Sequence, residues 1–303
     1  MAKNLLKNVG ACRVDLIDRN PHPFGLIRTG VAPDHQAMKR IENDFSQVLE
    51  SDSCQFFGNV YVSGANGILA DWERDMINQR GHWQVSIDEL QRNYSAVILA
   101  YGATSDRELG LEGEHSLLGV MPSRRIVEYY NGSLDMDLTS QEFNPELAEH
   151  IAIIGNGNIA CDISRMFLKD PKEFRESDTP EHVMQALRRS NVKTVSMIGR
   201  RGITSAAFST KEIRELASLE GLKTYLIEEE VDDSMTEASR TEFLDRAIKR
   251  RTEFLNNNCY FIENGEQYED VINRNEKKLI LRFLRNPTEL HEGEPGRIGG
   301  ATL

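Results

Sequence analysis

The chain has 303 residues, of which 39% are hydrophobic and 28% are charged, so it is long enough for two domains with packed cores. The net charge of −12 argues against a general nucleic-acid binder, because the phosphate backbone would be repelled. No apolar run approaches the roughly 20 residues that a membrane span requires. The four cysteines have no metal-ligand spacing and indicate reduced thiols inside a cell.

The first half of the chain predicts short α/β elements. Residues 2–8 have a helical pattern, residues 12–19 alternate as a strand does, and residues 20–35 are too rich in proline and glycine for regular structure. The elements expected next are an amphipathic helix over 36–51, strand-like sequence in CQFFGNVYVS, a polar stretch over 66–83 and a short capped helix in SIDELQRNY. The apolar run 95–103 predicts a buried strand that ends in a glycine turn.

The second half predicts a new α/β unit. HIAIIGNGNIACDISRMF, from residue 150, is typical of a buried strand, a glycine turn and a helix that reaches about residue 168. A helix in HVMQALRRS, a strand over 193–201 and a capped helix in STKEIRELASLEGL follow. Beyond residue 223 the pattern is charged and weak, with a long helix through TEFLDRAIKRRTEFLNN and a strand in KKLILRFLRN.

The turn GNGNIA indicates a dinucleotide site. Gly155 permits the sharp turn after the strand, Gly157 leaves room for a pyrophosphate to approach the backbone, and Ala160 keeps helix and strand close. The helix then offers free N–H groups and a positive dipole end to the phosphates. The motif is weak alone, but here it follows a buried strand and opens a helix, as such a site requires. The alternative is an ordinary turn between a strand and a helix.

The end of the next strand indicates which dinucleotide would bind. An NAD site places an acid there, whereas this strand ends in Arg200 and Arg201, which suit the 2′-phosphate of NADP(H). A solvated arginine turn on the surface is the alternative. Glu212 follows soon after and either lies near the nicotinamide-side ribose or completes a capping box with Ser209, and both roles can hold.

The earlier half suggests a second nucleotide unit. Its first strand ends in Asp18, whose carboxylate could accept a hydrogen bond from a free ribose 2′-hydroxyl. FAD has such a hydroxyl. The loop 20–35, stiffened by prolines and loosened by glycines, suits wrapping around a flat ring system. A plain surface acid at a strand end is the alternative for Asp18.

Four segments together resemble the adrenodoxin reductase family, the mitochondrial NADPH–ferredoxin oxidoreductases, and its bacterial relatives. They are PFGLIRTGVAPDH, SAVILAYGA, IIGNGNIACDISRMF and IGRRGITSAAFSTKEIREL, and they occur in the order that the family has. The resemblance covers nearly the whole chain except 66–83 and the stretch beyond about 223. It implies an α/β fold with two Rossmann-like domains, in which the NADP domain is inserted into the FAD domain. Residues 1–149 would be a partial FAD-binding domain and residues 150–303 the NADP-binding domain.

The resemblance also implies roles for individual residues, none of them catalytic and none a metal ligand. For FAD, Asp18 would take the ribose, although relatives usually carry Glu there, and Leu26 and Val62 would line the cofactor. For NADP(H), the implied contacts are Asn156, Gly157, Asn158 and Ile159 with the phosphates, Arg200 and Arg201 with the 2′-phosphate, and Glu212 with the nucleotide.

The function that the resemblance implies is transfer of electrons from NADPH through FAD to a 2Fe–2S ferredoxin of the adrenodoxin type. It places the protein on the matrix side of mitochondria and allows a peripheral association with the inner membrane. The acidic ferredoxin would dock on a basic patch, with a merely solvated face as the alternative. The cations considered for this patch are Arg188, Arg189, Lys193, Arg200, Arg201, Lys211 and Arg214.

Two departures from the family lead us to expect a chain truncated at both ends. The family begins with a strand, G-x-G-x-x-G turn and helix for FAD, and it ends with a Gly-Trp pair and a Gly-Pro-x-Gly turn, neither of which occurs here. One alternative function is therefore a non-catalytic NADP(H)-binding fragment that has lost FAD. Another is a different pyridine-nucleotide flavoprotein, such as a relative of thioredoxin reductase or glutamate synthase. The missing C-x-x-C excludes its dithiol version.

Overall fold

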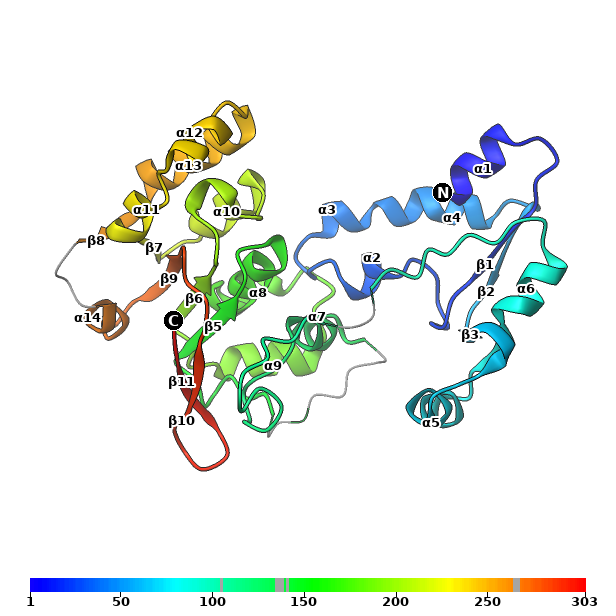
Figure 1. Ribbon diagram of the computed structural model, residues 1–303, viewed down its shortest axis with the longest axis horizontal. Helices are drawn as coiled ribbons and strands as arrows, with labels where there is room; N and C mark the ends of the chain where they lie inside the picture. The colour runs from blue at the N-terminus through cyan, green and yellow to red at the C-terminus, as the bar shows by residue number, and fades with distance from the viewer. Residues whose placement is uncertain (104–105, 134–138, 140–141, 264–267) are drawn as a thin grey trace. The chain divides into compact units, whose positions relative to one another are not determined.

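The computed structural model forms two compact units (Figure 1). Unit 1 comprises Met1–Val31 and His35–Ser105, and unit 2 comprises Ala32–Asp34 and Asp106–Leu303. The residues that the structure describes are 1–103, 106–133, 139, 142–263 and 268–303. Within these ranges, every helix is too short or too polar to cross a lipid bilayer.

Unit 1 contains two small parallel sheets, each of two strands. The sheets pair β1 (Val14–Ile17) with β2 (Cys54–Phe57) and β3 (Val60–Ser63) with β4 (Trp83–Ser86). The helices are α1 (Ala2–Asn8), α2 (Leu26–Thr29), α3 (Gln36–Lys39), α4 (Ile41–Leu49), α5 (Asp71–Arg80) and α6 (Ile87–Asn93), with a 3-10 turn η1 (Ala65–Gly67). The predicted cap of α6 is confirmed, because the Ser86 hydroxyl accepts from the Glu89 amide.

Three predictions for unit 1 were wrong. Residues 95–103 are not a strand, and the side chains of Leu99 and Tyr101 are 62% and 78% exposed. A strand needs a neighbour for its backbone groups, and no described strand pairs with this segment. The loop 20–35 contains the short helix α2, which begins after Gly25 at φ 46°. The helix predicted over 36–51 is interrupted at Arg40, whose ψ of −17° is too shallow for a continuous α-helix.

Unit 2 is built on a five-stranded sheet with the order β5-β6-β9-β7-β8, all parallel. These strands are β5 (His150–Ile154), β6 (Thr194–Ile198), β7 (Leu222–Ile227), β8 (Tyr260–Ile262) and β9 (Lys277–Arg282), and an antiparallel pair is formed by β10 (Glu289–Glu292) and β11 (Ile298–Thr302). The α-helices are α7 (Ser123–Asn131), α8 (Asn158–Leu168), α9 (Glu181–Arg189), α10 (Thr210–Ala217), α11 (Glu228–Asp233), α12 (Glu237–Glu242), α13 (Arg246–Asn258) and α14 (Tyr268–Ile272). The 3-10 helices are η2 (Pro171–Phe174) and η3 (Ile203–Ser205).

The two faces of this sheet carry separate hydrophobic cores. Along β9, Leu279 and Leu281 belong to the larger core, with side chains from α8, α10 and α13. Ile280 points to the opposite face and joins the smaller core, which includes Val271 of α14. This alternation is what a strand with two buried faces requires. Among the described residues, both clusters of buried apolar side chains lie in unit 2, so unit 2 holds the packed core.

The main elements predicted for unit 2 are confirmed, including the strand–turn–helix of β5 and α8 and the following α9, β6 and α10. The long helix predicted over 241–257 is instead divided between the end of α12 and α13, because Asp245 caps α13 by accepting from the amides of Ala247 and Ile248. Strands β7 and β8 were not predicted. The compact units divide between residues 105 and 106, whereas the assignment of 1–149 to FAD and 150–303 to NADP concerns ligands and stays a prediction.

Candidate functional site

The glycine turn between β5 and α8 is open on the side where a ligand would approach. Gly155 has φ 127°, a conformation that favours glycine, and its amide donates to the carbonyl of Ile198 at 2.7 Å. Gly157 is the N-cap of α8. A Cβ added at either glycine would meet no atom within 4 Å. The first amides of α8 therefore face free space, as the predicted phosphate site requires.

Asn156 holds this turn in place from behind. Its side chain is 8% exposed, and Nδ2 donates to the carbonyl of Arg282 at 3.0 Å. Its own carbonyl accepts from the amides of Ala207 and Phe208 at 2.8 and 2.9 Å. Gly199 makes room for it, because a Cβ there would lie 2.3 Å from Asn156 Nδ2. The Asn156 side chain therefore fixes the turn to the ends of neighbouring elements, and the predicted contact of this residue with the NADP phosphates stays a prediction.

The beginning of α8 is also joined to the beginning of α10. Asn158 is exposed, and its Oδ1 accepts from the amide of Ser209 at 2.7 Å. Ser209 in turn caps α10, since its hydroxyl accepts from the amide of Glu212 at 3.2 Å. Ile159 points outward and is 53% exposed. Both helix ends thus lie at one edge of unit 2.

Arg200 and Arg201 lie at this same edge. Ile198 of β6 pairs with Ile154 of β5 in parallel, so the arginines follow the strand end that neighbours the glycine turn. Both side chains are exposed, and neither forms an ion pair with any residue that the structure describes. Two guanidinium groups without a carboxylate partner beside an open helix end make a site for an anion.

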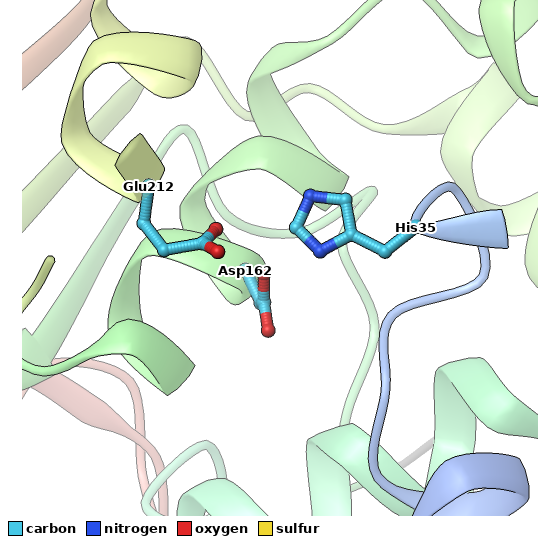
Figure 2. Close-up of side chains that lie close together, drawn as sticks. All are labelled: His35, Asp162 and Glu212. Atoms are coloured by element: carbon cyan, nitrogen blue, oxygen red, sulfur yellow. The ribbon is translucent and has the colours of Figure 1, made fainter. Parts of the chain in front are cut away.

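Glu212 faces inward from α10 and is 7% exposed. Figure 2 shows its carboxylate beside that of Asp162 from α8, and oxygens of the two lie within 4.8 Å of each other. The buried guanidinium of Arg165 serves both, at 2.7 Å from Asp162 Oδ1 and 3.6 Å from Glu212 Oε2. His35, also labelled there, belongs to unit 1. The predicted cap by Ser209 is confirmed, but the reciprocal half of the capping box is not formed, because the Ser209 amide donates to Asn158. The contact of Glu212 with a nucleotide stays a prediction.

A cluster around Glu230 was missed from the sequence. The Glu230 carboxylate is fully buried and accepts from Arg282 Nε and from the amide of Phe283, both at 2.8 Å, and it forms an ion pair with Arg285, whose Nε lies 2.9 Å away. These residues come from α11 and from the end of β9. Glu230 belongs to the acidic run EEEVDD, and nothing in that run distinguishes it from its exposed neighbour Glu229.

Of the seven cations considered for a basic patch, five flank β6 at its opposite ends, and Lys211 and Arg214 lie in α10. Arg188, Arg189 and Lys193 precede the strand, whereas Arg200 and Arg201 follow it, and its five residues span roughly 16 Å. The three cations at the beginning pair with Glu181, Glu146 and Glu149 respectively, at 3.3 to 3.7 Å. Among the five cations that flank β6, those without an ion pair in the described residues are therefore the two at the carboxyl end of the strand.

The residues predicted for FAD all lie in unit 1. Asp18 directly follows β1, and its Oδ1 accepts from the amide of Asn20 at 2.9 Å. Leu26 opens α2 and is 77% exposed, and Val62 lies in β3 and is 37% exposed. The exposed positions of both apolar side chains are compatible with contact to a ligand, and their roles stay predictions.

No protein-family model matches the chain. Curated relatives do match along its whole length. The NADPH:adrenodoxin oxidoreductase of Mus musculus mitochondria is 38% identical over 309 residues, which cover 100% of this chain and 56% of the relative. The enzyme of the same name from Arabidopsis thaliana is 34% identical over 305 residues, covering 100% of this chain and 57% of the relative. The chain therefore spans about half the length of the curated relatives it matches.

Solved structures give the same relationship. A variant of FprA from Mycobacterium tuberculosis superposes with a TM-score of 0.78 at 30% identity, over 98% of this chain and 59% of that one. FprA in complex with NADPH superposes with a TM-score of 0.77 at 29% identity, over 99% of this chain and 63% of that one. The resemblance to the adrenodoxin reductases and the predicted Rossmann-like α/β fold are both confirmed.

Proposed function

We propose that this chain, a homologue of the adrenodoxin reductases along its whole length, is the NADPH-binding part and a portion of the FAD-binding part of a flavoprotein oxidoreductase. The acceptor of its electrons would be a 2Fe–2S ferredoxin of the adrenodoxin type. Because the curated relatives are mitochondrial by name, we place the protein in mitochondria, on the matrix side. Unit 2 from residue 150 onward would bind NADP(H), and residues up to 149 would contribute to the FAD site.

One observation carries the NADP(H) assignment. The open glycine turn and the exposed guanidinium groups of Arg200 and Arg201 lie at the same edge of one parallel sheet. Neither arginine is neutralised by an ion pair with the described residues, so both remain available to the 2′-phosphate that distinguishes NADPH from NADH. FprA, the similar protein from Mycobacterium tuberculosis, forms a complex with NADPH, which agrees with this assignment.

The roles of the chain's own residues follow from the geometry. The free amides of α8 and its dipole bind the pyrophosphate above Gly157, where no Cβ intrudes. Asn156 and Gly199 keep the turn in that position. Bound cofactors would supply the redox chemistry, hydride from NADPH and single-electron release from FAD. The protein has to orient them and exclude water, so no side chain need act as a nucleophile.

The substitution of Arg200→Ala together with Arg201→Ala tests the cofactor assignment. The dissociation constants of NADPH and NADH would be measured by titration calorimetry for the parent chain and the double variant. Loss of two charge-assisted contacts should weaken the binding of NADPH by roughly a hundredfold and leave the affinity for NADH nearly unchanged. Arg188→Ala with Arg189→Ala, at the opposite end of β6, is the matched control. Equal loss of both nucleotides would overturn the assignment.

A second candidate function is binding of NADP(H) without flavin. It is favoured by the distribution of the core, because both buried apolar clusters among the described residues lie in unit 2. Leu26 and Val62, the predicted FAD contacts, are exposed in unit 1. The absorption spectrum of the chain purified in the presence of FAD separates the two functions. Flavin bands that survive gel filtration support the reductase, whereas a colourless protein that still binds NADPH supports the second candidate.

A further inference from the structure

The end of β9 lies directly beside the arginine pair that follows β6. Ile198 and Arg282 are paired at the last position of the two parallel strands. Beyond them the backbones stay connected, since the amide of Gly199 donates to the carbonyl of Arg282 at 3.0 Å. The amide of Arg285 donates back to Gly199 at 3.1 Å, and that of Leu284 donates to the carbonyl of Arg201 at 3.3 Å. Residues 282–285 and 199–201 therefore form one interlocked edge.

Leu284 takes an unusual conformation to make this connection. Its φ is 55°, in the left-handed region that a leucine rarely adopts. The flanking hydrogen bonds of Leu284 and Arg285 depend on this turn. The chain therefore accepts a strained residue at the point where it places Arg285 beside Gly199.

Glu230 then fixes the direction of the Arg285 side chain. The carboxylate has no exposed surface, and its Oε1 forms an ion pair with Arg285, 2.9 Å from Nε. The same oxygen accepts from Arg282 Nε at 2.8 Å and lies 2.7 Å from Arg282 Nη2 in the ion pair. A guanidinium held through Nε keeps the two Nη groups free, and these are the groups that bind a phosphate in a forked geometry. The Arg285 side chain is 33% exposed, and the described residues offer its Nη groups no hydrogen-bond partner.

The charges at this edge do not balance. One buried carboxylate, Glu230, faces two guanidinium groups, and Arg200 and Arg201 add two more cations without an ion pair among the described residues. The Glu242 carboxylate interacts electrostatically with Arg201 and offsets one of these charges in part, so the edge keeps a positive surplus. A phosphate monoester carries a charge of about −1.5 to −2 near neutral pH and offers three acceptor oxygens. Such a group would compensate the surplus, whereas the 2′-hydroxyl of NADH could not.

We propose that Arg285 is a third guanidinium of the 2′-phosphate site and that Glu230 is the residue that positions it. The inference rests on the proposed NADP(H) function and extends it to a segment that lies more than 80 residues further along the chain than Arg200 and Arg201. Arg285 recognises the phosphate that separates the two coenzymes and makes no contact on which NADH depends.

Arg285→Gln tests this role, because glutamine keeps polarity at a partly exposed position and removes the charged fork. Its affinities for NADPH, NADH, adenosine 2′,5′-bisphosphate and 5′-AMP would be measured by titration calorimetry. We expect NADPH and the bisphosphate to bind roughly tenfold more weakly, with NADH and 5′-AMP unchanged. Arg285→Lys keeps the positive charge but lacks the forked pair of Nη groups, so its affinity for NADPH should lie between those of the parent and the Arg285→Gln variant. Arg188→Gln, an exposed arginine near the beginning of β6, is the control.

The outcomes distinguish this inference from the function on which it rests. If Arg285→Gln leaves the ratio of NADPH to NADH affinity unchanged while the double variant of Arg200 and Arg201 lowers it, Arg285 has no role in specificity. If neither variant lowers the ratio, the NADP(H) assignment itself fails. Weakening of all four ligands together would show a structural role and overturn the proposal. Glu230→Gln provides a second measurement, and it should lower the same ratio wherever the variant still binds 5′-AMP normally.

Discussion

The guanidinium of Arg165 and the carboxylate of Asp34 form a two-pronged ion pair in the interior of unit 2. Nε lies 2.7 Å from Oδ2, and Nη2 lies 3.0 Å from Oδ1. The side chains are 0% and 4% exposed. Since the residues are 131 positions apart, this pair attaches the short segment Ala32–Asp34 to α8, although the chain on both sides of that segment belongs to unit 1.

Replacing Arg165 with methionine should destabilise unit 2 strongly. The variant removes the buried cation shared by Asp34, which is buried and keeps an ion pair with Lys169 at 3.4 Å, and by the half-buried Asp162. Breaking such a buried pair costs about 3–5 kcal/mol. Urea unfolding followed by circular dichroism measures the change. Arg188→Met is the matched control, because its ion pair with Glu181 is exposed and should contribute under about 1 kcal/mol. Similar losses in both variants would show that burial of the Arg165 cluster contributes nothing particular.

The two glycines at the nucleotide edge should respond oppositely to alanine. Gly157 has φ −109° and open space around it, so Gly157→Ala should change the free energy of unfolding by less than about 1 kcal/mol. Gly157→Ala should nevertheless weaken the binding of NADPH, because the methyl group occupies the space proposed for the pyrophosphate. Gly199→Ala should cost about 1–3 kcal/mol, since its Cβ meets the Asn156 amide, which is itself fixed on Arg282.

Thermal unfolding measures the stability of each glycine variant, and titration with NADPH measures its affinity for the nucleotide. A Gly157→Ala protein that binds NADPH as the parent does would contradict the placement of phosphate above the turn. A Gly199→Ala protein as stable as the parent would show that Asn156 can move without loss, and the fastening role assigned to it would be wrong.

Removing the cap of α10 should have a smaller effect. Ser209→Ala loses the hydroxyl that accepts from the Glu212 amide, a change that typically costs about 1 kcal/mol. The amide of Ser209 still donates to Asn158, so the link between the two helices remains. Ser209→Asn restores a capping oxygen and should recover most of the stability in urea unfolding. An asparagine variant no more stable than the alanine variant would argue against the cap.

The features predicted correctly from the sequence are those encoded by neighbouring residues. The strand, glycine turn and helix at 150–168 lie within one continuous segment, and the caps at Ser86 and Ser209 involve partners three residues away. The missed features depend on distant residues. Nothing local links Asp34 to Arg165, or Glu230 to Arg282 and Arg285, because each pairing exists only after the sheet has formed.

The segment 95–103 is a case in which the local sequence predicted a strand that the structure does not form. Its apolar run has the composition of a buried strand, but composition does not supply the neighbouring strand whose backbone groups it would need. In the described part of the chain Leu99 and Tyr101 are exposed and the segment is unpaired. Strand formation depends on its partners as much as on its own residues.

His150, at the start of β5, should make the stability of unit 2 fall in mild acid. Burial, and secondarily the charge of Lys278, lower the pKa of this imidazole from its ordinary value of 6.5 to about 4. Its Nε2 lies 2.8 Å from the Ser196 hydroxyl, which is 2.6 Å from the Tyr268 hydroxyl. The folded state therefore holds a neutral imidazole within a hydrogen-bonded chain.

The direction of the pH effect follows from which state binds the proton. Below pH 6.5 the unfolded chain protonates His150 and the folded one does not, so stability is lost as the pH falls towards about 4. By pH 5 the loss from this residue should be about 2 kcal/mol. His150→Gln keeps a neutral side chain that can hydrogen-bond to Ser196, and its stability should fall about 2 kcal/mol less than that of the parent between pH 7 and pH 5. Urea unfolding of both proteins at the two pH values measures this difference. The contributions of all other titrating groups cancel in the comparison. An equal decline of stability in both proteins would show that His150 titrates normally in the folded protein.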